Sequence, residues 1–135
     1  MTDWLLKSDP DEYSFDDLLR DKRTTWDGVS NNQALIYLRQ MKKGDRVFVY
    51  HTGDERSIVG LAEIAGAPRT DSRDASGKLV VVDIVVKRRL PKPVSLADIK
   101  ADVAFADCPL VRIPRLSVMP IEEALAERIL EMAGA

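Results

Sequence analysis

Cysteine and histidine are scarce in this chain, and each scarcity excludes a class of site. Cys108 is the only cysteine among the 135 residues, so neither an internal disulfide nor a metal site built from several cysteines can form. His51 is the only histidine, which excludes a histidine-rich zinc or iron site. Any Ser-His-Asp triad would have to use that one residue. We therefore expect no metal and no cofactor.

Long hydrophobic runs and an excess of positive charge are also missing. No apolar run approaches the roughly 20 residues of a membrane span, and the first residues lack the basic and apolar regions of a secretion signal. We expect a cytoplasmic protein with no membrane partner. The formal net charge is −2, whereas proteins that hold DNA mainly through its phosphates tend to be strongly basic. Any contact with nucleic acid is therefore expected to be local and to depend on a pocket.

The composition is that of a single globular domain over residues 1–135. Apolar residues make up 45% and charged residues 31%, which are ordinary values for such a domain. Hydrophobic periodicity and turn residues predict strands separated by single short helices. The expected strands span residues 3–7, 46–51, 57–65, 79–88, 110–113 and 116–119, and the expected helices span residues 14–21, 30–43, 95–101 and 121–133. This order indicates an α+β fold, a small curled sheet or barrel with helices over its open end.

Residues 24–33, TTWDGVSNNQ, place one of only two tryptophans in a polar turn before a helix. Ser30 and Gln33 have the spacing of a capping box. The amides of Asn31 and Gln33 can donate and accept hydrogen bonds, and a helix start adds free N–H groups. Together with the flat ring of Trp26, these groups are what recognition of a heterocyclic base requires. The alternative is structural: Trp26 would cap the sheet, and the amides would cap the helix.

Five motifs in order resemble the EVE domain family. They are WLLKSDPDEYSFDDL, TTWDGVSNNQALIYLRQMKKGDRVFVYHT, IVGLAEI, PKPVSLADIKAD and PRLSVMPI, and together they cover nearly the whole chain. The resemblance implies a PUA-like fold, which is a small mixed β-barrel with surrounding helices. It also implies a non-catalytic module that recognises a modified nucleobase in an aromatic pocket. The partner would be modified DNA or RNA, or a free modified base.

The resemblance favours a ligand-binding role for Trp26, whose ring would stay open to a stacked base. Lys7 and Ser8, at the end of the first expected strand, would bring a cation and a hydroxyl to the same pocket mouth. Ordinary surface and turn roles explain these two residues equally well. In the family, the arginine at the position of Arg115 lies near the pocket side, where it would contact a phosphate or base. A surface salt bridge is an equally good explanation of Arg115.

The chain departs from the family's usual pattern at the expected pocket rim. Where the family usually has Gly-Val-Arg-Asn-Tyr-Gln-Ala-Arg, residues 28–35 read Gly-Val-Ser-Asn-Asn-Gln-Ala-Leu. Both arginines and the tyrosine are missing. Leu79 stands where the family often has a tryptophan, and Asp9 stands where it usually has glutamate. With fewer basic and aromatic residues around the expected pocket, the sequence predicts weaker binding of nucleic acid.

Two other functions are compatible with the sequence. A small hydrolase of the related ASCH type, acting on modified nucleosides, would use Lys7 and Glu63 as a nucleophile or base pair in close contact. A protein-interaction module with a vestigial pocket would explain the missing arginines and the negative net charge. The basic run of residues 87–89, with Lys92, would either bind the phosphates along a nucleic-acid backbone or form a solvated strand end.

Overall fold

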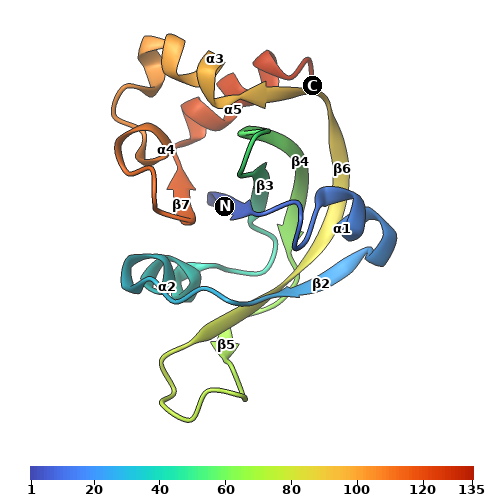
Figure 1. Ribbon diagram of the computed structural model, residues 1–135, viewed down its shortest axis with the longest axis vertical. Coiled ribbons are helices and arrows are strands. Elements are labelled where there is room, and N and C mark those ends of the chain that lie inside the picture. The colour runs from blue at the N-terminus through green and yellow to red at the C-terminus, as the bar shows by residue number, and fades with distance from the viewer.

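Seven strands form one mixed sheet in the computed structural model, which describes residues 1–135 (Figure 1). The strands are β1 (Asp3–Ser8), β2 (Arg23–Trp26), β3 (Arg46–His51), β4 (Ser57–Ile64), β5 (Arg69–Thr70), β6 (Val80–Ser95) and β7 (Val118–Ile121). The helices are α1 (Phe15–Asp21), α2 (Asn32–Gln40), α3 (Leu96–Ala101), α4 (Pro109–Arg112), α5 (Glu123–Met132) and a short 3-10 helix, η1 (Val103–Phe105). β1 runs parallel to β3, and the other ladders are antiparallel.

The sheet curls without closing. Its order is β2-β6-β4-β3-β1-β7, with β5 paired to β6, so β2 and β7 are edges that no ladder joins. Of the two expected forms, the curled sheet is present and a closed barrel is not, because closure requires hydrogen bonds between the two edge strands. Helix α2 packs against both β6 and β7 and covers the gap (Figure 1). The expectation that a helix covers the open end is correct.

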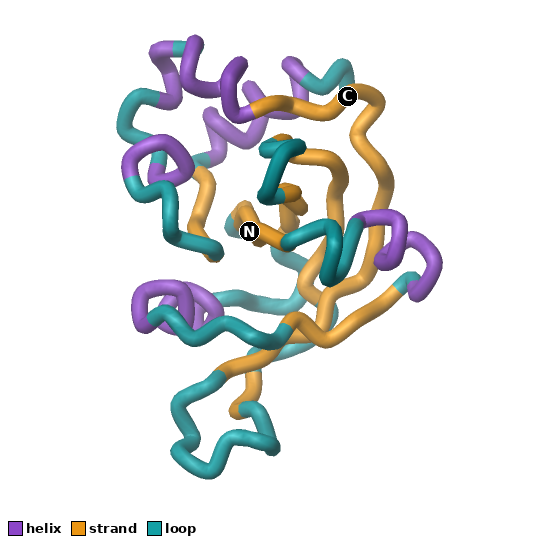
Figure 2. The backbone as a smooth tube through the Cα atoms, in the orientation of Figure 1, coloured by secondary structure: helices purple, strands orange, loops and turns teal.

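β6 is the longest strand and extends well beyond the expected residues 79–88 (Figure 2). Pro91 and Pro93 argue against a strand in this region, because proline cannot donate to a ladder. In the structure both prolines lie within β6 and are exposed, while Leu90 and Val94 are buried. The ladder with β4 shifts register near Gly60, and such bulges bend a strand. One bent strand thus runs from β5 to the start of α3.

Most expected elements are present with ends shifted by one or two residues, but two predictions are wrong in kind. Residues 110–113 were expected to form a strand, and the structure has helix α4 there. Pro109 occupies the first turn of that helix, where its missing N–H is not needed. Residues 23–26 form strand β2 along β6, although the sequence placed Trp26 in a turn. The expected polar loop 67–78 contains the two-residue strand β5.

Trp4 belongs to the core, as its apolar strand predicts, and is anchored there by a buried carboxylate. Its Nε1 donates to Oδ2 of Asp45 at 2.9 Å. Asp45 is 5% exposed and also accepts from the backbone N–H groups of Lys42 and Thr2. Burial alone would raise the pKa of Asp45, but these hydrogen bonds hold it below its ordinary value. This cluster ties the N-terminus to the turn before β3.

The rest of the structure contains few features that would suggest other chemistry. No helix is both long and apolar enough to cross a lipid bilayer. No three His, Cys, Asp or Glu side chains are grouped so that they could hold a metal ion. Cys108 lies in the core, where burial raises the pKa of its thiol.

Candidate functional site

A hollow of about 610 Å³ opens where the ends of β1 and β2 meet the turn between β2 and α2. Its lining comes from residues 7–13, from 24–31 and from Ser117. The motif TTWDGVSNNQ thus lies along one wall, and the end of the WLLKS segment lies along another. The fold brings together two parts of the sequence that were expected to share a pocket mouth.

Trp26 ends β2 and is mostly buried. Its pairing with Val82 of β6 fixes the backbone, and the residue is only 8% exposed, so it contributes to the core as well as to the hollow. The ring of Tyr13 meets the indole edge-on, with ring centroids 6.5 Å apart and planes at 87°. The ring that was expected to stay open is therefore largely covered. A limited part of it faces the hollow, next to Tyr13.

Asn31 rather than Ser30 is the N-cap of α2. Its Oδ1 accepts from the backbone N–H of Ala34 at 3.0 Å, and the capping box expected between Ser30 and Gln33 is absent. Asn31 lines the hollow, while Gln33 is exposed and lies outside it. Since the cap uses only the oxygen, the Nδ2 group of Asn31 remains available to donate to a ligand.

Lys7 and Ser8 line the hollow, as expected, but both already have partners within the protein. The Nζ of Lys7 donates to the carbonyl of Pro114 at 2.8 Å and lies 5.4 Å from the ring centroid of Tyr50. Burial lowers the pKa of Lys7. The hydroxyl of Ser8 donates to the carbonyl of Tyr13. Ser8 can still accept a hydrogen bond, so it offers a ligand an acceptor rather than a donor.

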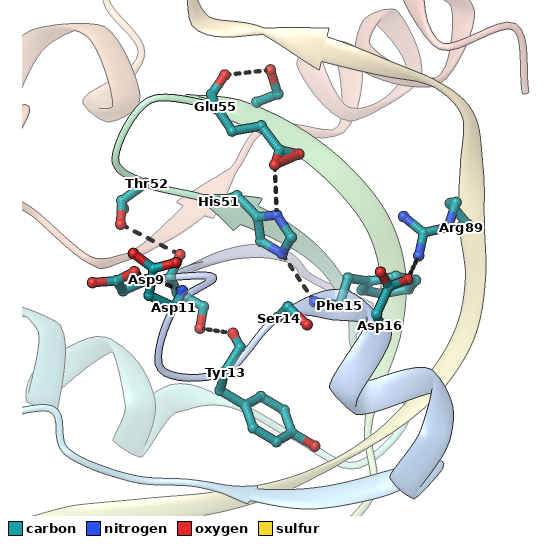
Figure 3. A network of polar contacts seen from close by, with 12 residues as sticks. Asp9, Asp11, Tyr13, Ser14, Phe15, Asp16, His51, Thr52, Glu55 and Arg89 are labelled. Carbon is teal, nitrogen blue, oxygen red and sulfur yellow. Dashed lines mark hydrogen bonds and ion pairs between the residues drawn. The ribbon is translucent and has the colours of Figure 1, made fainter.

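His51 holds the segment that carries Tyr13 (Figure 3). Its Nε2 accepts from the backbone N–H of Phe15 at 2.9 Å, and its Nδ1 lies 3.2 Å from Oε2 of Glu55. Because Nε2 accepts, the proton is on Nδ1 and is donated to Glu55. The imidazole side chain is 7% exposed and forms no hydrogen bond with a hydroxyl or thiol, since its partners are Phe15 and Glu55. Its role is structural: it fixes the start of α1 and therefore the wall formed by residues 9–13.

Carboxylates outnumber cations in the lining. Asp9, Glu12 and Asp27 face the hollow, and Lys7 is the only cation among the lining residues. Arg115 is exposed, makes no ion pair and lies outside the hollow. Sequence reasoning missed the carboxylates because they lie in two separate turns that only the fold brings together. It also did not include Tyr13, which lines the hollow beside Trp26.

Lys7 and Glu63, the pair required by a hydrolase of the ASCH type, do not meet. Glu63 of β4 pairs with Arg46 of β3. Arg46 in turn pairs with Asp3 of β1, which lies four residues before Lys7. Four strand residues span about 13 Å. The carboxylate of Glu63 instead lies 3.9 Å from the Nζ of Lys87. The structure therefore contains no such catalytic pair.

The chain matches known protein families over most of its length. The family model for the EVE domain matches residues 2–132. Thymocyte nuclear protein 1 of Homo sapiens is 32% identical over 73% of this chain and 55% of the human protein, so the chain spans about half the length of that relative. The Rattus norvegicus protein of the same name is 30% identical over 98% of this chain and 74% of the relative.

Solved structures agree with this match. A protein from Rhodopseudomonas palustris has a TM-score of 0.94 and 38% identity, covering 99% of this chain and 94% of the other. Human THYN1, in complex with 5-methylcytosine containing DNA, has a TM-score of 0.92 and 27% identity, covering 100% and 99%. An ASCH protein from Zymomonas mobilis has a TM-score of 0.62 and 9% identity, covering 96% of this chain and 94% of the other. This likeness shows a shared fold alone. The family model, the relatives and the shared fold establish that this chain belongs to the EVE domain family.

Proposed function

We propose that this protein is a non-catalytic binding domain that recognises a modified nucleobase of DNA or RNA in the hollow beside Trp26. The observation that carries the proposal is the joint presence of two aromatic rings and a free side-chain amide around one opening. The volume of about 610 Å³ falls within the range of roughly 300–1,000 Å³ that is typical of small-molecule sites. A base would leave its stack to enter, unless it lies in a single strand or is free.

Each lining group has a role in this proposal. Trp26 and Tyr13 offer an apolar contact for the base, and stacking on an aromatic contributes about 1–3 kcal/mol per base. The Nδ2 group of Asn31 donates to the base edge, and Ser8 accepts from it. Lys7 lies at the end of β1, where its ammonium is held by Pro114. Gln33 and Arg115 lie outside the hollow, so the proposal gives neither of them a contact with the base.

The comparisons support nucleic acid as the partner. Human THYN1, whose structure holds 5-methylcytosine containing DNA, superimposes over the whole of this chain. We also propose that the open sheet is a PUA-like fold. In this fold α2 would lie where a closed barrel has a ladder between β2 and β7. A cytoplasmic location is part of the same proposal, and cell fractionation checks it.

The proposal is tested by equilibrium titration with single-stranded oligonucleotides of one sequence. The set carries cytosine, 5-methylcytosine or 5-hydroxymethylcytosine at one position, and the free nucleosides are titrated in parallel. We expect at least one modified strand to bind more tightly than the unmodified strand. A Trp26→Leu variant should lose that preference, while a Trp4→Phe variant, changed in the core away from the hollow, should keep it. Equal and negligible binding of every strand would remove the proposal.

An activity assay and the titration together separate the rival functions. A hydrolase would convert acylated nucleosides, and chromatography of the incubation mixture detects the product. The separation of Lys7 from Glu63 in the sheet gives no support to that function. A protein-interaction module would bind no strand at all. The hollow argues against a vestigial pocket, because side chains do not fill it.

A further inference from the structure

A second hollow of about 480 Å³ adjoins the first and shares the wall formed by Asp27 and Gly28. Its other wall is the segment between β5 and β6, residues 71–79. Figure 1 shows this segment extending from the lower end of the sheet, below β2 and α2. The remaining lining residues are Asp71, Arg73, Asp74 and Leu79.

The carboxylates on this wall are held by hydrogen bonds within the segment itself. Asp71, whose side chain is 10% exposed, accepts from the backbone N–H, Nε and Nη2 of Arg73. Asp74 accepts from the backbone N–H groups of Ser76, Lys78 and Leu79. These bonds lower the pKa of both carboxyls, the largest causes being Arg73 for Asp71 and the Leu79 N–H for Asp74. The segment therefore has a defined shape, in which Arg73 offsets the charge of Asp71 and Asp74 stays ionised.

Arg73 is the cation of the second hollow and is held in a fixed orientation. Its Nη2 lies 2.9 Å from Asp71 and 2.9 Å from Oδ2 of Asp27, which belongs to the shared wall. The side chain is 70% exposed, and its Nη1 donates to no group of the protein. A guanidinium that is oriented by one carboxylate and free along another edge matches the geometry of a phosphate.

We propose that the second hollow is a flanking subsite, in which Arg73 binds the phosphate next to the base held beside Trp26. The inference rests on the proposed function, because it needs a base in the first hollow. The two hollows share a wall, so a strand whose base enters the first passes its backbone over Asp27 and Gly28. On binding, the phosphate replaces Asp27 as the second partner of Arg73. The first hollow has Lys7 as its one cation, and its ammonium is already held by the carbonyl of Pro114, so that hollow does not supply such a contact.

A structural role is the alternative, in which the Arg73–Asp27 ion pair only ties the segment to the turn. The two roles predict opposite results for one substitution. Asp27→Asn removes the competing carboxylate and leaves Arg73 held by Asp71, so a phosphate-binding Arg73 would bind a strand more tightly. If the pair only supports the turn, Asp27→Asn and Arg73→Gln would both weaken binding of every ligand.

The test measures the dissociation constants of a single-stranded 5-methylcytosine oligonucleotide and of free 5-methyl-2′-deoxycytidine. For Arg73→Gln we expect the strand to bind about fivefold more weakly, the size of one exposed ion pair, with the nucleoside unchanged. For Asp27→Asn we expect about twofold tighter binding of the strand. Arg73→Lys should fall between wild type and Arg73→Gln. Lys100→Gln, the same change of charge on α3 at the far end of the molecule, should have no effect.

The outcomes separate this inference from the proposed function. If the strand shows its preference for the modified base and Arg73→Gln binds it as wild type does, the flanking subsite is wrong and the base site stands. If Arg73→Gln weakens strand and nucleoside alike, or if Asp27→Asn weakens the strand, the structural role is right and the inference is overturned. If wild type binds neither ligand, the proposed function and the inference both fall.

Discussion

The ring of Phe15 lies directly against Gly60, which leaves no room for a side chain at that position. A β-carbon on Gly60 would lie 2.2 Å from Cζ of the ring and less than 3 Å from two neighbouring ring atoms. Phe15 is fully buried and begins α1, where its N–H donates to His51. The absent side chain on β4 is therefore what allows α1, and the segment before it, to pack against the sheet.

Replacing this glycine should destabilise the protein. We expect Gly60→Ala to lower the free energy of unfolding by about 1–3 kcal/mol, the usual cost of overpacking a core. Urea denaturation followed by circular dichroism gives the value. Gly66→Ala is the matched control, since its β-carbon would have nothing within 4 Å, and it should change stability by less than about 0.5 kcal/mol. Equal effects of the two substitutions would show that the packing on Phe15 is not tight.

Removal of the Asp45 carboxylate should also destabilise the protein. Asp45→Ala leaves the buried Nε1 of Trp4 and the N–H groups of Lys42 and Thr2 without their acceptor. A buried donor without a partner costs about 1–3 kcal/mol, and we expect a loss in that range in urea denaturation. Asp54→Ala, in an exposed turn, should be neutral. If Asp45→Ala leaves the free energy of unfolding unchanged, water replaces the carboxylate as hydrogen-bond acceptor without loss of stability.

The contribution of Asp45 should depend on pH in a defined direction. Its folded-state pKa is lowered, so the carboxylate stabilises the protein above its unfolded pKa of about 3.9 and loses this effect as pH falls through the folded value. The difference in unfolding free energy between wild type and Asp45→Ala should be constant above about pH 5 and shrink below about pH 4. Unfolding curves between these limits measure it, and a difference that grows on acidification would contradict the assignment.

Two substitutions of Asn31 should separate its cap from its ligand contact. Asn31→Ala removes the acceptor for Ala34 and should cost about 1 kcal/mol of stability. Asn31→Asp keeps a good cap, so stability should remain within about 0.5 kcal/mol of wild type. The aspartate cannot donate to a base and adds negative charge, so it should weaken binding of the modified strand. Unchanged affinity in Asn31→Asp would make Asn31 a helix cap and nothing more.

Binding to a strand should depend weakly on salt. The lining of the first hollow is acidic, and Arg73 is the one cation assigned to a phosphate. For a single strand, one phosphate contact gives a slope of about −0.7 in a plot of log K against log salt concentration. The free nucleoside should give no slope, and Arg73→Gln should bring the strand's slope close to zero. A slope of about −3 or steeper would indicate a phosphate track, such as the basic residues 87–92 of β6.

Local signals in the sequence predicted the elements that depend on near neighbours. The helices expected at 14–21 and 95–101 are present, and each begins after a serine N-cap, Ser14 with a capping box to Asp17 and Ser95. Strands β1, β3 and β4 lie within one residue of the strands predicted at residues 3–7, 46–51 and 57–65. The order of motifs also identified the family, because it reflects the whole domain and not one segment.

Features that depend on distant contacts could not be predicted. Whether β2 meets β7 depends on where α2 packs, and no local pattern encodes that. The family resemblance favoured an open ring for Trp26 in its polar turn, yet pairing with Val82 and contact with Tyr13 bury most of it. The contact between Arg73 and Asp27 joins residues 46 positions apart. The two segments that the sequence singled out line one hollow, and binding there stays a prediction, while the acidic lining and the second hollow emerged only from the fold.

The most direct test is a crystal structure of the protein with a single-stranded 5-methylcytosine oligonucleotide. The account predicts the modified base inside the first hollow, in van der Waals contact with Trp26 and within hydrogen-bond distance of the Asn31 amide. Its neighbouring phosphate should lie at Arg73. A strand bound along residues 87–92 with the hollow empty, or a base held elsewhere on the surface, would contradict it.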